Sequence, residues 1–113
     1  MHELALCESI RSIIEEQARA QGFAKVERVA LEVGAFSGVE IAALRFGFDV
    51  AMNGSVAQGA TLEIVELPGE GWCMPCGRAV RLARRYDSCP HCGGVQIQVT
   101  GGEDLKIREL EVC

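Results

Sequence analysis

The sequence predicts an α+β fold in which a small cysteine-rich unit is inserted into a domain of two helices and a three-stranded sheet. Three observations support this prediction. Apolar residues recur at spacings of three and four near the N-terminus, alternating apolar residues mark strands further along, and four of the six cysteines gather between residues 73 and 92. The length of 113 residues suits one ordinary domain or two very small ones.

The first half of the chain predicts two helices and two strands. The first helix is expected over residues 3–21, with Gly22 ending it and an inward face of Leu4, Cys7, Ile10, Ile14 and Ala18. The first strand is expected over residues 25–33, where Val29, Leu31 and Val33 alternate with other residues. A second helix is expected over residues 39–51, because Ser37 and Glu40 have the spacing of a capping box, and a second strand over residues 61–67.

The second half of the chain places the cysteine unit between two breaks. Pro68-Gly69-Glu70-Gly71 predicts a linker and Gly101-Gly102 a second break, with strand-like segments at 80–82 and 95–99 beside the cysteines. Residues 105–112 again read as a strand. A two-stranded sheet is marginal, so we expect this last strand to return to the first sheet. The expected domains are residues 1–68 with 104–113, and residues 69–103 between them.

Composition and charge exclude several classes of protein. Hydrophobic residues make up 49% of the chain and charged residues 24%, as in a folded globular protein and unlike a disordered one. No apolar run approaches the roughly 18 residues that a membrane-spanning helix needs. The N-terminus does not have the pattern of a signal peptide, so the reducing cytoplasm is the expected location. The net charge of −5 argues against a general nucleic-acid binder.

The clustered cysteines form two Cys-x-x-Cys pairs, Cys73 with Cys76 and Cys89 with Cys92. In a reducing compartment such pairs are more often metal ligands than disulfides. A glycine follows the second cysteine of each pair (Gly77 and Gly93) and can adopt positive φ, which lets backbone N–H groups turn towards the sulfurs. Four thiolates in a tetrahedron suit a structural Zn²⁺ that closes a ribbon too small for its own core.

The spacing alone leaves other interpretations of this cluster open. Tetrahedral sulfur ligation also suits iron, so a rubredoxin-like electron carrier is one alternative. Four arginines and one aspartate between residues 71 and 100 give this segment a local charge of +3. The cluster Arg78, Arg81, Arg84 and Arg85 therefore supports a second alternative, a zinc-ribbon module that binds nucleic acid or a protein. Few aromatic residues lie near it for base stacking, and His91 is expected to be exposed rather than a ligand.

The first three residues, Met1-His2-Glu3, can chelate a metal ion. The bulky His2 should discourage removal of Met1, so the α-amine, the amide nitrogen of His2 and its imidazole can close fused rings on one ion. The amide of Glu3 would complete four nitrogens in a plane, a geometry that Ni²⁺ and Cu²⁺ favour over Zn²⁺. Glu3 can also be a first-turn carboxylate that complements the helix dipole. The segment therefore has two interpretations, a metal site and an ordinary helix start.

Taken together, these segments resemble the HypA/HybF family of nickel metallochaperones for hydrogenase maturation. The resemblance rests on the terminal MHE, the stretch FDVAMNGSVAQGATLEI, the segments ELPGEGWCMPCG and RRYDSCPHCG, and the closing VTGGEDLKIRELEV. It implies that His2 is the essential nickel ligand beside Glu3, and that Cys73, Cys76, Cys89 and Cys92 hold structural zinc. It further implies an α/β nickel-binding domain with a separate zinc ribbon, a rubredoxin-like knuckle.

The resemblance also implies partners and the absence of catalysis. Members of the family work with the GTPase HypB and deliver nickel to the hydrogenase large subunit precursor, and some serve urease. No catalytic turnover is expected, in line with the lack of a serine–histidine–acid set. A homodimer and a monomer are both compatible with the sequence. Cys7 is expected to be a small buried apolar residue and Cys113 an exposed thiol without a function.

Overall fold

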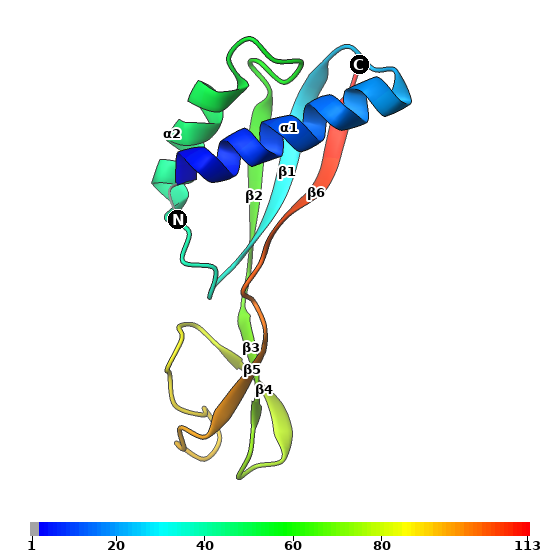
Figure 1. The fold of residues 1–113 in the computed structure, drawn as a ribbon. Coiled ribbons are helices and arrows are strands. Elements are labelled where there is room, and N and C mark those ends of the chain that lie inside the picture. The colour runs from blue at the N-terminus through cyan, green and yellow to red at the C-terminus, as the bar shows by residue number, and fades with distance from the viewer. Residues whose placement is uncertain (1–2) are drawn as a thin grey trace. The chain divides into compact units, whose positions relative to one another are not determined.

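The computed structural model describes residues 3–113, and its elements form two compact units. The described residues form two helices and six strands, which Figure 1 labels in the order of the chain. They are α1 (Glu3–Gln21), β1 (Val26–Gly34), α2 (Ile41–Met52), β2 (Thr61–Leu67), β3 (Gly69–Cys73), β4 (Arg78–Leu82), β5 (Ile97–Gly101) and β6 (Leu105–Val112). None of the helices in this described part is long and apolar enough to cross a membrane.

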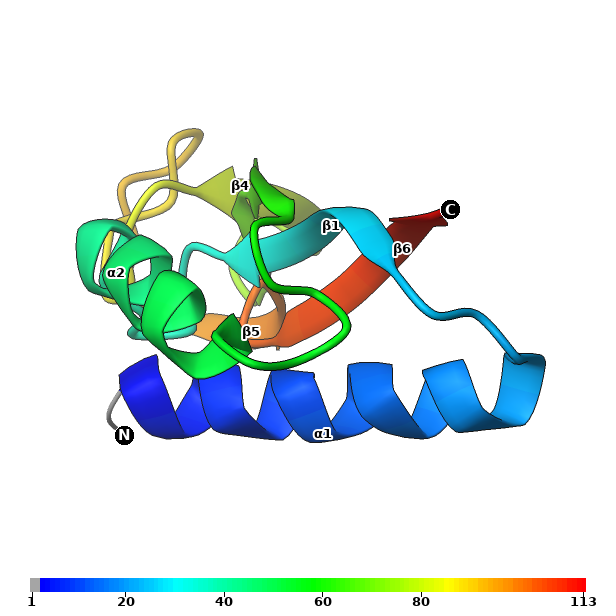
Figure 2. The ribbon, with the colours of Figure 1, turned by 90° about the horizontal axis from the view of Figure 1, so that it is seen from above.

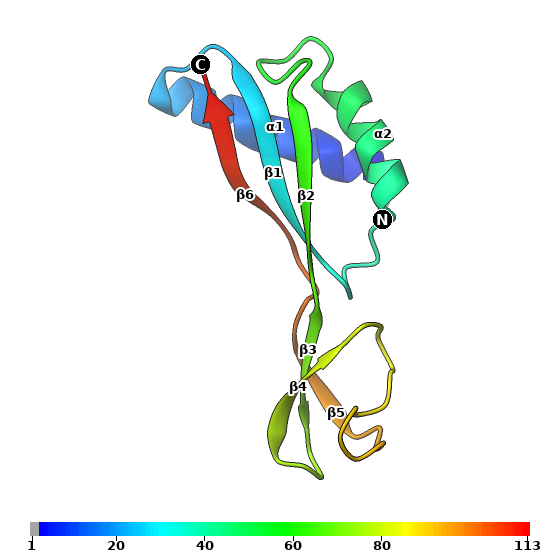
Figure 3. The ribbon, with the colours of Figure 1, turned by 180° about the vertical axis from the view of Figure 1, so that it is seen from behind.

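One three-stranded sheet has the order β2-β1-β6. Figure 3 shows β2 running parallel to β1 and β6 running antiparallel to it. The last strand of the chain thus joins the first sheet, as the sequence predicts, and the α+β fold with an inserted cysteine unit is confirmed. A second sheet, β4-β3-β5, forms within the inserted segment by antiparallel pairing of β3 with both neighbours.

Helix α1 forms a layer against the sheet of the first unit, and α2 lies near its N-terminal end (Figure 2). The buried side of α1 consists of Cys7, Ile10, Ile14 and Ala18, four of the five residues that the helical spacing places inward. The fifth, Leu4, is 42% exposed. The helix ends as expected at Gly22, whose φ of +77° suits glycine and whose N–H donates to the carbonyl of Ala18.

The second unit comprises residues 32–38 and 65–106, with its own small core. That core contains Phe36, Val80 and Leu82 together with two of the clustered cysteines, Cys73 and Cys89. A core this small needs a further stabilising element, which the cysteine cluster can supply by binding a metal ion.

The predicted linker over residues 68–71 is wrong, because residues from Gly69 onwards belong to β3. The glycines there serve close packing rather than flexibility. A Cβ at Gly69 would collide with the ring of Phe36, and one at Gly71 with the side chain of Ile97. Sequence reasoning cannot separate these two uses of glycine, since the closely packed partners lie far away in the chain.

The predicted capping box at Ser37 is also wrong. Helix α2 begins at Ile41, and Glu40 is its N-cap, with a carboxylate oxygen 2.6 Å from the N–H of Ala43. The start therefore lies two residues later than predicted. Gly38, with a φ of +76°, interrupts any helical path from Ser37.

Candidate metal centres

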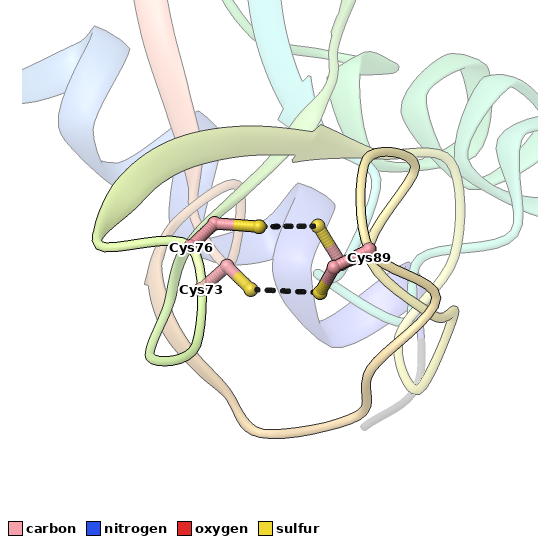
Figure 4. A group of neighbouring side chains, drawn as sticks. Cys73, Cys76 and Cys89 are labelled. Atoms are coloured by element: carbon pink, nitrogen blue, oxygen red, sulfur yellow. Dashed lines mark hydrogen bonds between the residues drawn. The ribbon is translucent and has the colours of Figure 1, made fainter.

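The structure brings the four predicted zinc ligands together in the second unit. Their sulfur atoms all lie within 4.8 Å of one another. The sulfur of Cys73 is 3.6 Å from that of Cys92, and the sulfur of Cys76 is 3.9 Å from that of Cys89. Figure 4 shows Cys73 and Cys76 on one side of the cluster and Cys89 on the other, with dashed lines for the two sulfur–sulfur contacts.

Two tight turns set this arrangement. Gly77 and Gly93 have positive φ, +61° and +72°, as the sequence predicts, and each N–H donates to the carbonyl of the first cysteine of its pair. The N–H groups that reach sulfur come from other residues. His91 donates to Cys89 and Gly94 donates to Cys92, both at 3.4 Å. The glycines therefore close the turns, while their neighbours orient the sulfur atoms.

Hydrogen bonding shifts the pKa values of two of the clustered thiols in opposite directions. The pKa of Cys89 is lowered to about 6, chiefly because the backbone N–H of Cys92 stabilises its thiolate. The pKa of Cys76 is raised to about 12, first by its hydrogen bond with the Cys92 thiol and then by burial. Since neighbouring thiolates repel one another, the set can ionise fully only around a cation.

The donor set and its spacing fit Zn²⁺. With Zn–S bonds of about 2.3 Å, tetrahedral geometry requires sulfur atoms about 3.8 Å apart. The observed 3.6 and 3.9 Å agree with that value. The four cysteines supply all four positions of a closed structural site, and His91 is exposed, as expected for a residue outside the ligand set.

The predicted nickel segment lies partly outside the described residues. Met1 and His2 are not described, whereas Glu3 is the first residue of α1 and is half-buried. One carboxylate oxygen of Glu3 accepts a hydrogen bond of 3.2 Å from the backbone N–H of Glu40. The start of α1 is thereby attached to the start of α2.

Sequence reasoning missed Glu40 as a neighbour of this segment. The backbone N–H of Glu40 donates to the Glu3 carboxylate, and the Glu40 carboxylate caps α2. Two glutamates therefore meet where the start of α1 contacts the start of α2. The capping-box spacing places Glu40 at the start of a helix, but no sequence signal connects it with Glu3, 37 positions earlier.

The two remaining cysteines lie outside the cluster. Cys7 is fully buried, and burial, followed by the charge of Glu3, raises the pKa of its thiol to about 11. Its sulfur donates to the carbonyl of Leu44 at 3.5 Å. Cys113 is exposed, and a hydrogen bond with Glu27 raises the pKa of its thiol. Neither thiol is poised as a thiolate nucleophile at neutral pH.

The predicted arginine cluster is partly used within the second unit. Arg85 lies over the ring of Phe36, 5.1 Å from its centroid, donates to the Phe36 carbonyl and pairs with Glu103 at 2.8 Å. It holds the loop after β1 on the ribbon. Of the four clustered arginines, Arg78, Arg81 and Arg84 remain exposed for an external partner, which weakens the case for a nucleic-acid module.

The fold and the four-cysteine site define a metal-binding protein that joins a helix-and-sheet unit to a zinc-ribbon-like unit. A family model described as "Hydrogenase/urease nickel incorporation, metallochaperone, hypA" matches residues 1–112. The hydrogenase maturation factor HypA 2 of Bradyrhizobium diazoefficiens is 56% identical over 112 residues, which cover 99% of each chain. HypA of Acidithiobacillus ferrooxidans is 54% identical with the same coverage.

A solved structure has a similar fold over nearly the whole chain. The solution structure of the Ni metallochaperone HypA from Helicobacter pylori aligns with a TM-score of 0.72 and 26% identity, covering 99% of this chain and 97% of the other. The chain belongs to the HypA family of nickel metallochaperones for hydrogenase maturation.

Proposed function

We propose that this chain binds one Ni²⁺ through Met1, His2 and Glu3 and delivers it to a hydrogenase large subunit precursor, together with a HypB-type GTPase. The whole-chain match to a nickel-incorporation family carries this proposal. The sequence supplies the chelating segment, and a hydrogen bond from the Glu40 N–H reaches the carboxylate of its last residue, Glu3. Nickel is cargo in this function, and no substrate is turned over.

The proposed ligands are the α-amine, the amide and imidazole nitrogens of His2, and the amide nitrogen of Glu3. The first four N–H groups of a helix have no acceptor within that helix. Ligation through the amide of Glu3 therefore leaves the hydrogen-bond ladder of α1 intact. Four nitrogens in a plane favour Ni²⁺ over Zn²⁺, so the terminal site and the four-cysteine site select different ions.

The four cysteines would hold Zn²⁺ as a structural ion in the second unit. A bound zinc ion supplies charge compensation for the thiolates and links the two turns. The residues around it orient the sulfur atoms, and Val80 and Leu82 pack beside them.

Nickel binding should weaken as the pH falls. Both the α-amine, with an ordinary pKa of about 7.7–8.0, and the imidazole, at about 6.5, must lose a proton before they can bind a metal. Affinity should therefore drop steeply between about pH 8 and pH 6. This dependence makes acidification a route to release.

The test of the proposal is an equilibrium Ni²⁺ titration of zinc-loaded protein carrying His2→Ala. Loss of tight nickel binding with zinc and fold retained is the expected result, because the imidazole and its chelate ring disappear. His91→Ala is the matched control, since it removes the other histidine of the chain and should leave nickel affinity unchanged. Unchanged affinity in His2→Ala would refute the terminal site.

A further inference from the structure

The first turn of α1 is packed differently from the rest of the helix. From Cys7 onwards its inward residues are buried, with Ile10 and Ile14 exposing 3% and 0% of their surface. Leu4, one turn earlier on the same face, exposes 42%. The hydrogen bond from the Glu40 N–H to the Glu3 carboxylate lies at an exposed position. Less buried apolar surface means that this turn opens at a lower free energy than the remainder of α1.

An apolar groove lies beside this turn. Its volume is about 390 Å³, and it is lined by Glu3, Leu4, Ala43, Phe46, Gly47 and Val50. Phe46 and Val50 stay 63% and 52% exposed along it. The helix pair thus leaves unfilled space next to Glu3, the described residue of the proposed nickel segment.

Gly47 keeps part of that space empty. It lies in the middle of α2, where glycine lowers helix stability relative to alanine. A Cβ added there would lie 3.4 Å from the Cα of Leu4 and 3.4 Å from the sulfur of Cys7, at ordinary contact distance. Its φ is not in the left-handed region. Neither the backbone nor the available space requires a glycine, so its effect is to withhold a contact from the first turn of α1.

We propose that Gly47 is a positioning residue that keeps the first turn of α1 loosely seated, so that opening of this turn releases nickel. This inference rests on the proposed nickel site at Met1–Glu3. Glu3 belongs both to the turn and to the ligand segment, so when the turn opens, the geometry of the chelate changes. A tighter seat under Leu4 would hold the ligands in place longer and slow the transfer of nickel to an acceptor.

The test compares Gly47→Ala with the parent protein, both zinc-loaded and with the native terminus. Two quantities are measured: hydrogen exchange of the amides of Cys7 and Glu8, which lie beyond the unpaired N–H groups at the start of α1, and the rate at which bound Ni²⁺ passes to excess free histidine. The added methyl group should slow both by about fourfold, the effect of burying one more carbon. The thermal midpoint should rise as well.

Ser12→Ala is the matched control for general stabilisation. Ser12 is exposed on α1 and away from the groove, and its hydroxyl bonds the Glu8 carbonyl, so alanine improves helix propensity there without touching the first turn. Nickel transfer should keep the parent rate in this variant.

Three outcomes would overturn the inference. If Gly47→Ala protects the first turn but nickel leaves at the parent rate, opening of the turn does not govern release, although the nickel site stands. If Ser12→Ala slows release equally, the effect is global stability. If the parent protein binds no nickel at its terminus, the proposed function fails and this inference fails with it.

Discussion

At the scale of single residues, the chemistry of the cysteine cluster follows from how closely four thiols are held. Sulfur atoms 3.6 and 3.9 Å apart cannot all carry charge without a cation, and backbone N–H groups favour the thiolate of Cys89 first. We therefore propose that each cysteine is part of one ligand set rather than an independent thiol, and that removal of any member disables the whole site.

Cys92→Ser should lower zinc affinity by more than about 100-fold, since loss of a direct ligand exceeds the usual effect of second-shell changes. The backbone amides of β3 and β4 should then lose protection from hydrogen exchange. Competition with a chromophoric chelator measures the affinity. Cys113→Ser, which alters an exposed cysteine outside the cluster, is the control and should keep full zinc binding. A folded, zinc-replete Cys92→Ser protein would show that the ligand set is different.

Arg28 is a second residue with several dependent partners. Its guanidinium contacts Glu63 on β2 at 2.8 Å, and Glu109 and Glu111 on β6 at 2.7 and 3.2 Å. It thus links all three strands of the first sheet. The hydrogen bond from Arg28 lowers the pKa of Glu109, and the same contacts raise the pKa of Arg28.

A carboxyl titration of Glu109 followed by NMR should give a pKa below the ordinary glutamate value of about 4.3. Because the pKa of Glu109 is lower in the folded protein than in the unfolded chain, the ion pair stabilises the fold at pH values above the unfolded-chain pKa. This stabilisation is lost as the pH falls through the lowered pKa of the folded protein. In Arg28→Gln the Glu109 pKa should return towards 4.3. An identical Glu109 titration in both proteins would contradict the assigned cause.

At the scale of elements, the spacing of apolar residues predicted the helices and strands whose bounds depend on that spacing alone. Strand β2 (Thr61–Leu67) and strand β6 (Leu105–Val112) coincide with the predicted ranges, and α1 does so at both ends. The wrong predictions have two causes. Gly69 belongs to β3 because it pairs with Leu82 and leaves room for the ring of Phe36, and both partners lie far away in the sequence. Helix α2 starts late because the positive φ of Gly38 breaks the helical path and Glu40 then supplies the cap.

Glu40→Ala should destabilise α2 by about 1 kcal/mol, the usual effect of removing an N-cap acceptor. Glu40→Gln keeps an acceptor oxygen at the same place and should recover most of that loss. Urea unfolding monitored by circular dichroism measures both variants. Equal stability of Glu40→Ala and the parent protein would show that the hydrogen bond to Ala43 does not support the helix.

At the scale of the whole molecule, the candidate sites were predictable to different degrees. The four-cysteine site follows from two short-range spacings, and the sequence identifies all of its members. The surroundings of Glu3 do not follow from sequence spacing, because Glu40 contacts Glu3 only through the packing of α2 against α1. Likewise, the small core around Phe36 and the ion pairs of Arg28 join segments that no periodicity connects.

The proposed metal chemistry of this molecule is divided between two places. The cysteine cluster would hold a resident ion that maintains the second unit, whereas the terminal segment would hold an exchangeable one beside a loosely packed turn. Separate ligand types would keep the two ions apart, since thiolates suit Zn²⁺ and planar nitrogens suit Ni²⁺. The central claim is that nickel binds at the N-terminal chelate.

A Ni²⁺ titration of zinc-loaded protein, run beside a copy with one extra residue before Met1, tests that claim most directly. The extension keeps His2 but moves the α-amine out of the chelate ring. We expect one tightly bound nickel for the native terminus and loss of that binding for the extended protein. Equal tight binding in both proteins would contradict it, because the nickel ligands would then lie elsewhere in the chain.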